Sequence, residues 1–393
     1  MTMQRRSFLK KAGIGLAAGA VAAPAIAQTA SLPTVSWRLA SSFPKSLDTI
    51  FGGAEAIAKR VSAASGGKFT IRVFAAGEIV PAFSVHTAVQ NATVECAHTA
   101  PYYFFGTDPT FAFACAIPFG LNARQQNAWK YYGGGMEAMA LLYKDYGVVH
   151  FPAGNTGAQM AGWYRKEIRS LADLKGLKFR IGGLAGQVLA KLGAVPQQIA
   201  GGEIYQSLER GTIDAAEWVG PYDDEKLGFN KVAKFYYYPG WWEGGPELSL
   251  FVNEKKWAEL PKHYQAALES ACAEANVHML AKYDAKNPEA LRKLVAGGTQ
   301  LRAFPRPIME AALKAANELY DELSLKSPHW KRIYTEWRKF RAEQFLWFRV
   351  TEAAYDNFTL ANVRDPVTAA KPAAKPAAPK PAAPAALKAA PAK

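Results

Sequence analysis

Short segments in which every second residue is apolar alternate along the chain with longer segments whose apolar residues lie three or four positions apart. The first alternating segment covers Val35 to Ser41, a helical pattern covers Leu47 to Ala64, and KFTIRVFAAG (68–77) alternates again. A period of two is typical of a strand, and a period of 3.6 is typical of an amphipathic helix. The order strand, helix, strand predicts a β-α-β unit with a parallel sheet.

The rest of the chain extends this alternation and becomes mainly helical after residue 261. Further helices are expected at 82–92, 123–146, after Gly186, and at 202–210, 262–284, 287–296, 306–325 and 330–361. Three more β-like segments are expected at 148–154, 161–167 and 177–183. Strands that alternate with helices in this way predict an α/β fold.

The chain contains one internal echo. Residues 90–98, QNATVECAH, align without a gap with residues 209–217, ERGTIDAAE. Two lobes that each run from a helix end through a tight turn into a short buried strand would produce this repeat, and would direct His98 and Glu217 toward a shared cleft. Chance similarity over nine residues is the alternative. The repeat favours two α/β lobes, with the chain crossing between them, that close on a ligand.

The amino-terminal end differs in composition from folded protein. Residues 1–27 combine a basic start, an apolar Ala- and Gly-rich stretch and an AIA ending, as expected of an export signal. Arg5 and Arg6 followed by SFLK resemble the twin-arginine motif, although Gln4 stands where Ser or Thr is usual. The apolar stretch is shorter than the ~20 residues of a spanning helix. We therefore expect export to the periplasm through a twin-arginine-type signal, rather than a membrane anchor.

Charge and cysteine content exclude several classes of function. Residues 363–393 are rich in Ala, Pro and Lys and predict a disordered tail. The signal contributes four basic residues and residues 369–393 five, neither with an acid, so the formal net charge of +14 falls to +5 for residues 29–368. No nucleic-acid partner is therefore expected, although +5 can still steer small anions. The three cysteines have no CxxC or zinc spacing and allow at most one disulfide.

Motifs of hydrolases and nucleotide-binding proteins are missing from the sequence. The chain contains no GxSxG, HExxH or GxxxxGK[ST], and its six histidines form no i, i+4 pair. GGLAG (182–186) lies between a strand and a helix but lacks the GxGxxG spacing, which favours a tight strand-to-helix turn over a nucleotide loop.

Several polar side chains are instead embedded in aromatic and glycine-rich segments. Arg180 ends the strand LKFR directly before IGG, where a guanidinium can grip a carboxylate with two parallel hydrogen bonds. Gln159 lies in GNTGAQMAGW, and Tyr102 and Tyr103 follow a strand end rich in small residues. Taken singly, each of these residues is more often part of a core or a loop.

Two acids lie beside indoles. Glu217 precedes Trp218, and Glu243 lies within WWEGG. A carboxylate that is partly removed from water needs a cation or a hydrogen-bond donor to stay charged. Two carboxylates with neutral oxygen donors suit a hard cation such as sodium or calcium, and that cation together with Arg180 suits a small carboxylic acid.

Four segments resemble the extracytoplasmic solute-binding subunits (DctP-type) of TRAP transporters. They are GNTGAQMAGW (154–163), LADLKGLKFRIGG (171–183), PQQIAGGEIYQSLERGTIDAAEWVGPYDDEKLGF (196–229) and YYYPGWWEGG (236–245). The likeness covers about 30–362 and is closest to the branch that binds 2-oxo acids such as pyruvate, with a lactate-binding relative beside it. It implies a receptor that captures a small 2-oxo monocarboxylate and delivers it to the membrane permease, without catalysis.

The resemblance also implies a fold and a division of the chain. The fold would be the two-lobe periplasmic binding protein fold of the α/β class, with crossing segments and long C-terminal helices. The expected parts are the signal peptide (1–27), mainly lobe 1 (28–150), mainly lobe 2 (151–250), helices that complete the lobes and form a dimerisation helix (251–362), and the tail (363–393). In this branch the receptor is a homodimer.

Site residues are carried over position by position. Arg180 would pair with the carboxylate of the substrate, and a metal ion, sodium more than calcium, would bridge protein and substrate. The implied metal ligands are Gln159, Glu217, the carbonyl of Trp218, and Glu243. The implied substrate-facing residues are Arg180, Asn155, Tyr102, Tyr103, Gln159 and Trp218.

Two other classes of function stay open at this point. A periplasmic metal-dependent lyase or hydrolase acting on a keto acid could use the same acids around a catalytic cation, but none of these residues is an evident activated base or nucleophile. A surface-interaction protein would depend on the Ala/Pro/Lys tail, so that deleting residues 369–393 separates it from a receptor.

Overall fold

The computed structural model describes residues 32–363, so the expected export signal and residues 364–393 of the tail lie outside the described residues. The predicted β-α-β unit is confirmed at the start of this range. Strand β1 (Val35–Ser41), helix α1 (Ile50–Ala64) and strand β2 (Phe69–Phe74) follow one another, and β1 pairs with β2 in parallel with Val35 opposite Phe69. Alternate residues of β1, such as Trp37 and Leu39, are buried.

Two sheets organise the molecule. The first has the order β2-β1-β3-β10-β4, in which β3 (Cys96–Thr99) is parallel to β1, and β10 (Glu247–Asn253) is antiparallel to both β3 and β4 (Val148–Asn155). The second sheet has the order β11-β9-β5-β8-β6-β7. Its strands are β5 (Trp163–Tyr164), β6 (Lys178–Arg180), β7 (Val195–Gln197), β8 (Ala215–Ala216), β9 (Phe235–Tyr238) and β11 (Gln300–Ala303).

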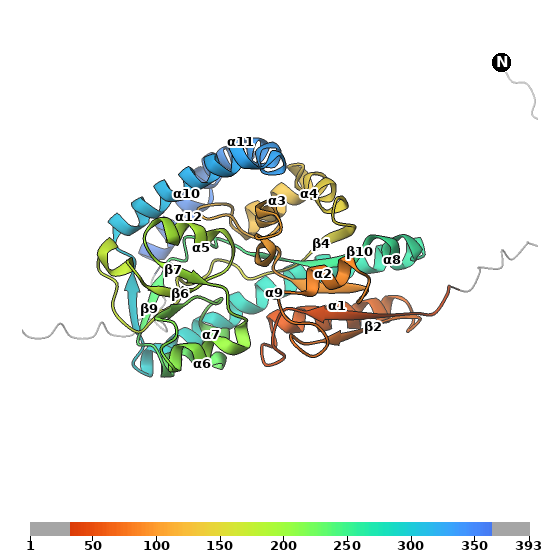
Figure 1. The fold of residues 1–393 in the computed structure, drawn as a ribbon, viewed down its shortest axis with the longest axis horizontal. Helices are drawn as coiled ribbons and strands as arrows, with labels where there is room; N and C mark the ends of the chain where they lie inside the picture. Colours follow the sequence, from red (N-terminus) through yellow and green to blue (C-terminus); the bar gives the residue numbers. More distant parts are fainter. Residues whose placement is uncertain (1–31, 364–393) are drawn as a thin grey trace, which may run out of the picture.

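The chain passes between the sheets three times, which confirms the predicted two-lobe α/β fold with crossing segments. It leaves the first sheet after β4, returns to it at β10, and leaves it again through helix α9 (Lys262–Ala296), which leads to β11 in the second sheet. Figure 1 shows α9 running along the molecule with α1 and α7 (Pro221–Leu227) beside it. Helix α9 packs against α1 and β4 in one lobe and against α7 in the other.

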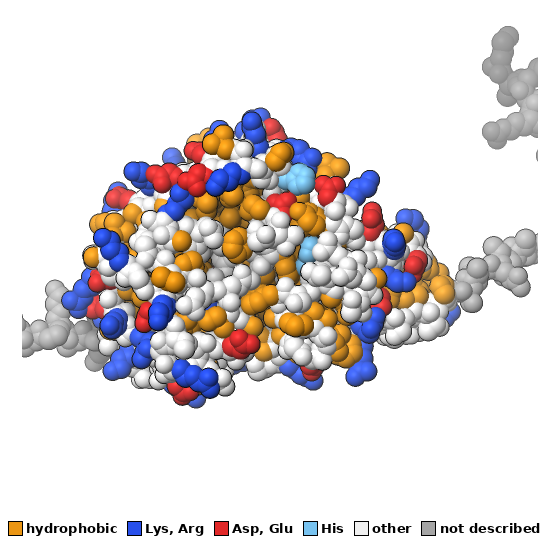
Figure 2. Space-filling model, in the orientation of Figure 1, with side chains coloured by type: hydrophobic (Ala, Val, Ile, Leu, Met, Phe, Trp, Pro, Cys, Tyr) orange, Lys and Arg blue, Asp and Glu red, His pale blue; other side chains and the backbone are white. Residues whose placement is uncertain are grey.

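The remaining helices cover the two sheets. They are α2 (Val85–Gln90), α3 (Ala123–Tyr132), α4 (Gly135–Lys144), α5 (Gly183–Lys191), α6 (Ile204–Glu209), α8 (Glu254–Glu259), α10 (Arg306–Lys326), α11 (Pro328–Val350) and α12 (Glu352–Asn362). Long C-terminal helices were predicted, and α10 to α12 confirm them; α11 arches over the upper edge in Figure 1. On the face drawn in Figure 2, acidic and basic side chains are interspersed. Between residues 32 and 363, none of the helices combines the length and apolar character that crossing a membrane requires.

Three predicted boundaries were wrong. The single helix expected over 123–146 is two helices, because Gly134 takes a left-handed φ of 78° between α3 and α4, which glycine accepts without strain. The two helices expected over 262–284 and 287–296 are one helix, α9, which continues through Pro288. Proline removes one helical hydrogen bond, but packing against both lobes keeps the helix continuous. The helix expected over 330–361 is divided into α11 and α12 at Thr351.

The internal echo corresponds to a structural repeat. In one lobe α2 ends at Gln90 and leads through a turn to β3, and in the other lobe α6 ends at Glu209 and leads to β8. Glu217 follows β8 directly, whereas His98 lies within β3 and its ring contacts the carbonyl of Ala153 at 3.1 Å. The equivalent positions therefore share a local fold but have different surroundings.

Candidate functional site

Arg180 and Glu217 are brought together by neighbouring strands of the second sheet. Strands β6 and β8 are parallel, with Arg180 opposite Ala216, so that both chains leave the sheet at the same edge. The carboxyl ends of parallel strands are where ligands bind in open α/β sheets. Arg180 and Glu217 are each only 1% exposed, and Trp218 is 4% exposed. These three predicted site residues therefore form one buried group at a strand edge.

The Arg180 guanidinium is held by three protein groups. Its Nε donates to the carbonyl of Ile199 at 3.0 Å, and its Nη1 donates both to the carbonyl of Glu217 at 2.8 Å and to the Glu217 carboxylate. The guanidinium carbon also lies 5.0 Å from the centre of the Trp218 ring. Nη2 is buried and has no hydrogen-bond partner among residues 32–363. The free end of Arg180 therefore presents a single nitrogen, Nη2, to a ligand.

Gln159 and Glu243 lie on two loops that run against each other. The backbone N–H of Gln159 donates to the carbonyl of Glu243 at 3.1 Å, and that of Gly240 donates to the carbonyl of Gln159 at 3.0 Å. A Cβ atom at position 240 would lie 2.6 Å from this carbonyl oxygen, so only glycine permits the approach. The Gln159 side-chain amide donates to the Thr156 hydroxyl at 3.0 Å, which directs its oxygen elsewhere.

Asn155 links the same two loops through its side-chain amide. Its amide nitrogen donates to the carbonyl of Gly245 at 3.1 Å, and its amide oxygen accepts from the N–H of Gly157 at 2.9 Å. Asn155 is fully buried and does not line the cavity described next. Both ends of its side chain are engaged with backbone, so these contacts do not support the expectation that it faces a substrate.

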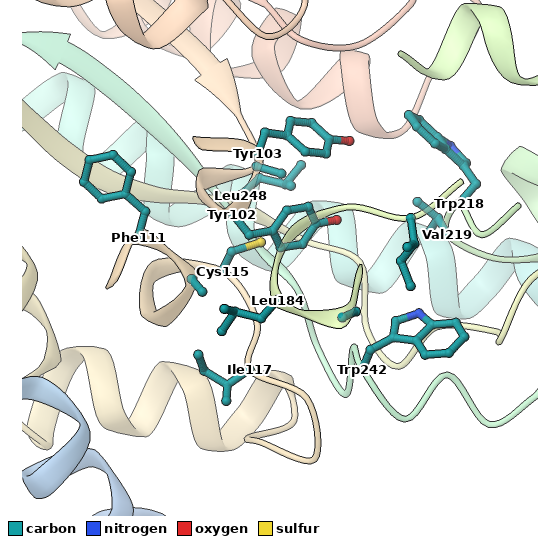
Figure 3. Packing of buried hydrophobic residues seen from close by; sticks show 14 of the residues in the cluster. Tyr102, Tyr103, Phe111, Cys115, Ile117, Leu184, Trp218, Val219, Trp242 and Leu248 are labelled. Atoms are coloured by element: carbon teal, nitrogen blue, oxygen red, sulfur yellow. The ribbon is translucent and has the colours of Figure 1, made fainter. Parts of the chain in front are cut away.

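A small cavity lies beside these residues, between the two lobes. Its volume is about 10 Å³, the space of roughly one water molecule. Figure 3 shows the hydroxyl ends of Tyr102 and Tyr103 directed toward the side where Trp218 and Val219 lie. The lining residues are Phe43, Ile50, Ala100, Tyr102, Tyr103, Thr156, Gln159, Arg180, Trp218, Val219, Pro246 and Leu248. The cavity therefore has a polar end at Arg180 and Gln159 and apolar walls.

Burial near this cavity disfavours the charged forms of two carboxyl groups, those of Glu217 and Glu243. Burial raises the pKa of the Glu217 carboxyl to about 7, against the opposing effect of Arg180. Burial, and then the neighbouring Glu217, raise the pKa of Glu243 well above its ordinary value, while a hydrogen bond with Tyr102 acts in the opposite direction. Two buried carboxylates beside one guanidinium leave a net negative charge, which a bound cation would neutralise.

The donor set suits a hard cation. Among the buried side-chain oxygens of residues 32–363 that have no hydrogen-bond partner, three belong to this site: Oε1 of Gln159, Oε2 of Glu217 and Oε2 of Glu243. Carboxylate and amide oxygens are the ligands that sodium and calcium prefer. Across residues 32–363 no group of three or more His, Cys, Asp or Glu side chains is placed to hold a metal. The cation ligands expected here include only two such side chains, Glu217 and Glu243, and their other oxygens come from the Gln159 amide and the Trp218 carbonyl.

Sequence reasoning missed the apolar lining. Phe43 lies between β1 and α1, Ile50 is the first residue of α1, and Val219, Pro246 and Leu248 lie shortly after polar site residues in the chain. Their only signal is an apolar residue near a strand end, which is common throughout the sequence. Asp223 and Asp224, which follow the Glu217 segment, bond instead to Tyr283 and to Trp163 and Tyr236, and are part of the fold around α7.

Comparison with known families decides the class of this site. Residues 40–327 match the model of the DctP family, the bacterial extracellular solute-binding proteins of family 7. The chain belongs to this family. A member of the DctP family is a receptor for transport, so the chain is a solute-binding protein and not an enzyme, and the enzymatic alternative left open by the sequence is set aside.

Three relatives of this DctP-family protein are informative. The monocarboxylate 2-oxoacid-binding periplasmic protein of Nostoc sp. is 53% identical over 360 residues, which is 91% of this chain and 99% of that protein. A TRAP transporter solute-binding protein from Bordetella bronchiseptica is 55% identical, with a TM-score of 0.83 over 84% of this chain and 98% of that chain; it is a mixed-occupancy dimer with calcium and picolinate in its occupied site.

The third relative holds sodium. A TRAP periplasmic solute-binding protein from Pseudoalteromonas atlantica is 40% identical, with a TM-score of 0.80 over 84% of this chain and 100% of that chain, and its structure contains sodium and pyruvate. The DctP-family assignment and the two-lobe fold therefore agree with both sequence and structural relatives.

Proposed function

We propose that this receptor captures a small 2-oxo monocarboxylate, pyruvate or a close analogue, together with a metal cation, and presents it to the membrane permease of a TRAP transporter. The observation that carries the proposal is the set of three unpartnered buried oxygens, from Gln159, Glu217 and Glu243, beside the free Nη2 of Arg180. These groups would provide for both a cation and a carboxylate. The binding of 2-oxo acids, pyruvate and picolinate by relatives supports this ligand class.

Each site residue has a role in this proposal. Gln159, Glu217, Glu243 and the Trp218 carbonyl would hold the cation, which when bound supplies positive charge to the carboxylate and 2-oxo oxygens of the ligand. Arg180 would donate from Nη2 to the carboxylate. Tyr102 and Tyr103 would face the ligand with their hydroxyls, and Trp218 would form a wall. Asn155 would act by holding together the loops that carry Gln159 and Glu243.

The walls of the cavity support a short acid. The lining offers a polar end at Arg180 and apolar residues such as Leu248 and Val219, and a small ligand with one polar and one apolar end matches this arrangement once the lobes part slightly to admit it. Pyruvate and picolinate share a carboxylate beside a second electron-pair donor, a pattern that can chelate a cation. We therefore infer that this chelating pair, rather than chain length alone, is what the site recognises.

For the cation, sodium remains our preferred candidate. Glu217 and Glu243 with a bound carboxylate carry three negative charges against one positive charge on Arg180, and like charges in a poorly solvated site repel strongly. One relative holds sodium and another calcium, so the relatives allow either ion. Sodium is the expectation because neutral ligands, an amide and a carbonyl, make up half of the proposed set, whereas calcium favours more oxygens and more charge.

The test is calorimetric titration with pyruvate in three buffers: chelated and sodium-free, sodium-containing, and calcium-containing. Because linkage is reciprocal, affinity for pyruvate should rise when the preferred cation is restored. Glu217→Gln keeps size and an oxygen donor but removes one charge, so its affinity should respond much less to the cation. Glu203→Gln, at an exposed position of the same lobe, is the matched control. Equal wild-type affinity in all three buffers would contradict the bridging cation.

We further propose that the receptor is a homodimer joined through its C-terminal helices. Large apolar side chains on α11 and α12 are exposed, which is unusual for a surface that stays in contact with water. They are Phe345, Leu346, Trp347, Val350, Tyr355, Phe358 and Leu360. A dimeric relative supports a second copy of this chain as the partner. In the cell we expect the protein in the periplasm, exported through its twin-arginine-type signal.

A further inference from the structure

Away from the ligand site, one ion cluster joins the two lobes. Asp48 lies between β1 and α1 of the first lobe, and its carboxylate contacts two lysines and a tyrosine from other parts of the chain. Lys226 forms an ion pair with it, and the Tyr222 hydroxyl donates to it at 3.2 Å. Lys282 donates to the Asp48 carboxylate at 2.9 Å and to its backbone carbonyl at 2.7 Å.

The partners of Asp48 belong to elements fixed in the second lobe and in the crossing helix. Tyr222 and Lys226 lie four residues apart on α7, so they project from the same face of that helix, and the Lys226 ammonium lies 3.8 Å from the Tyr222 ring centre. Asp224 of α7 accepts hydrogen bonds from Trp163 of β5 and Tyr236 of β9, which anchors the helix to the second sheet. Lys282 is on α9, which packs against both lobes.

The segments that the cluster joins are those that wall the cavity. The first-lobe segment 42–50 supplies Phe43 and Ile50 to the cavity, and the residues directly before α7 supply Trp218 and Val219. The rings of Phe43 and Trp218 lie 6.5 Å apart across it. None of the four cluster residues lines the cavity. The cluster can therefore affect how firmly the walls are held together without touching a ligand.

Asp48 is well placed to hold a charge pair. Its neighbours Leu47, Thr49 and Ile50 are buried, so its backbone position is set by packing. Its own side chain is 51% exposed, while those of Lys226 and Lys282 are 28% and 27% exposed. Burial alone would raise the pKa of Asp48, but hydrogen bonds from Lys226 and Lys282 lower it to about 2. The carboxylate is thus charged throughout the neutral range.

We propose that the Asp48 cluster is an interlobe latch, in which Lys226 and Lys282 hold the first-lobe segment 42–50 against α7 and favour the closed arrangement of the lobes. An isolated exposed ion pair contributes little, but two partly buried lysines on one carboxylate form a network. The latch adds to closure in the absence of ligand and slows ligand release when the lobes are closed. The expected change in the pyruvate dissociation rate rests on the proposed function, whereas the expected change in lobe opening does not.

The test compares Asp48→Asn and Lys226→Gln, singly and together, with Glu55→Gln as a control that removes the same charge from an exposed position of α1. We expect the dissociation rate of pyruvate to rise about three- to tenfold in each latch variant, and the double variant to show less than the product of the two single effects. The difference from the wild type should shrink between about 0.05 M and about 1 M salt, because screening weakens exposed ion pairs. Glu55→Gln should behave as the wild type.

Ligand-free protein provides the second measurement. The interlobe distance distribution, obtained by electron spin labels placed on α1 and α6, should shift toward longer distances in Asp48→Asn. If wild type and Asp48→Asn release pyruvate at the same rate at low salt and have the same distance distribution, the latch is wrong. If the wild type binds pyruvate in none of the three buffers, the proposed ligand is wrong, and the distance measurement alone then decides the latch.

Discussion

At the scale of single residues, the guanidinium of Arg180 uses some of its hydrogen-bond donors for contacts within the protein and leaves one for a ligand. The sequence suggested a two-pronged contact with a carboxylate, but Nε and Nη1 are already engaged with Ile199 and Glu217. Only Nη2 remains without a partner among the described residues. Arg180 therefore ties β6 to the segment after β8 and offers the ligand one nitrogen that the other contacts have fixed in place.

Replacing Arg180 with lysine should weaken pyruvate binding strongly although the charge is kept. A lysine ammonium has one nitrogen and cannot bond to Ile199, Glu217 and a ligand carboxylate from the positions that a guanidinium spans. Loss of a buried charge-assisted contact of this kind costs about 2–5 kcal/mol of binding free energy. Calorimetry with pyruvate and the preferred cation measures it, with Arg210→Lys, at an exposed position of the same lobe, as the control. Near-normal affinity in Arg180→Lys would place this residue outside the ligand contacts.

Asp224 predicts how stability depends on pH. Burial raises the pKa of its carboxyl to about 7, while hydrogen bonds from Tyr236 and Trp163 act in the opposite direction. Since an unfolded aspartate has a pKa of about 4, the folded state retains a proton between about pH 4 and pH 7 that the unfolded state releases. The contribution of Asp224 to the free energy of unfolding is therefore largest at the acidic end of this window and falls as pH rises through it.

Asp224→Asn should remove this component, since asparagine does not titrate. The wild type should lose at least about 1 kcal/mol more of its free energy of unfolding than the variant between about pH 5 and pH 8. Denaturant unfolding at several pH values measures the difference, and Asp321→Asn, at an exposed position of α10, is the control. A difference between wild type and Asp224→Asn that stays constant over this range would show that Asp224 does not titrate there.

At the scale of elements, α11 and α12 combine two different surfaces. The first turns of α11 bury Trp330, Ile333 and Trp337 against the body of the protein. From Phe345 onward most apolar side chains are exposed, with Phe348 half-buried, and no residue of α12 is buried. A helix that begins as core and ends as an apolar surface is consistent with a partner that covers the second part.

Charged substitutions on this surface should produce a monomer. Trp347→Glu combined with Phe358→Glu places two carboxylates on side chains that are 56% and 68% exposed in a single chain, so folding should be retained while association is lost. Light scattering should give the mass of a dimer for the mature wild type and that of one chain for the double variant. Leu325→Glu, on an 89% exposed side chain at the end of α10, should stay dimeric. A wild-type mass of one chain at working concentrations would exclude the proposed dimer.

At the scale of the whole molecule, the described residues form a receptor whose chain crosses repeatedly between two lobes. Export of this receptor is a prediction from residues 1–27, which lie outside the described range. The twin-arginine route accepts folded protein, which suits a receptor that could carry a metal. Replacing Arg5 and Arg6 with lysine should leave the precursor in the cytoplasm, as measured by cell fractionation and immunoblotting. Lys10→Arg with Lys11→Arg keeps the charge of the signal and should export normally. Normal periplasmic yield of the Arg5 and Arg6 variant would remove the twin-arginine assignment.

Local pattern and contiguous motifs were enough to predict much of this protein. The β-α-β start and the long C-terminal helices follow from periods of two and 3.6, which depend on residues at most a few positions apart. The two lobes were predicted from the repeat of residues 90–98 at 209–217 and from the family resemblance. The family followed from motifs around Gln159, Arg180 and Glu217, because each motif is a continuous segment. The orphaned oxygens of the structure agree with the polar residues that these motifs singled out.

Tertiary structure decided the features that depend on distant partners. Helix α9 continues through Pro288 because both lobes pack against it, although local preference favours a break there. The side chain of Asn155 bonds to backbone groups and does not line the cavity. The sequence could not show this, because its partner Gly245 is 90 residues further along the chain. For the same reason the sequence did not predict the latch. Lys226 and Lys282 are far from Asp48 in the chain and contact it only in the folded protein.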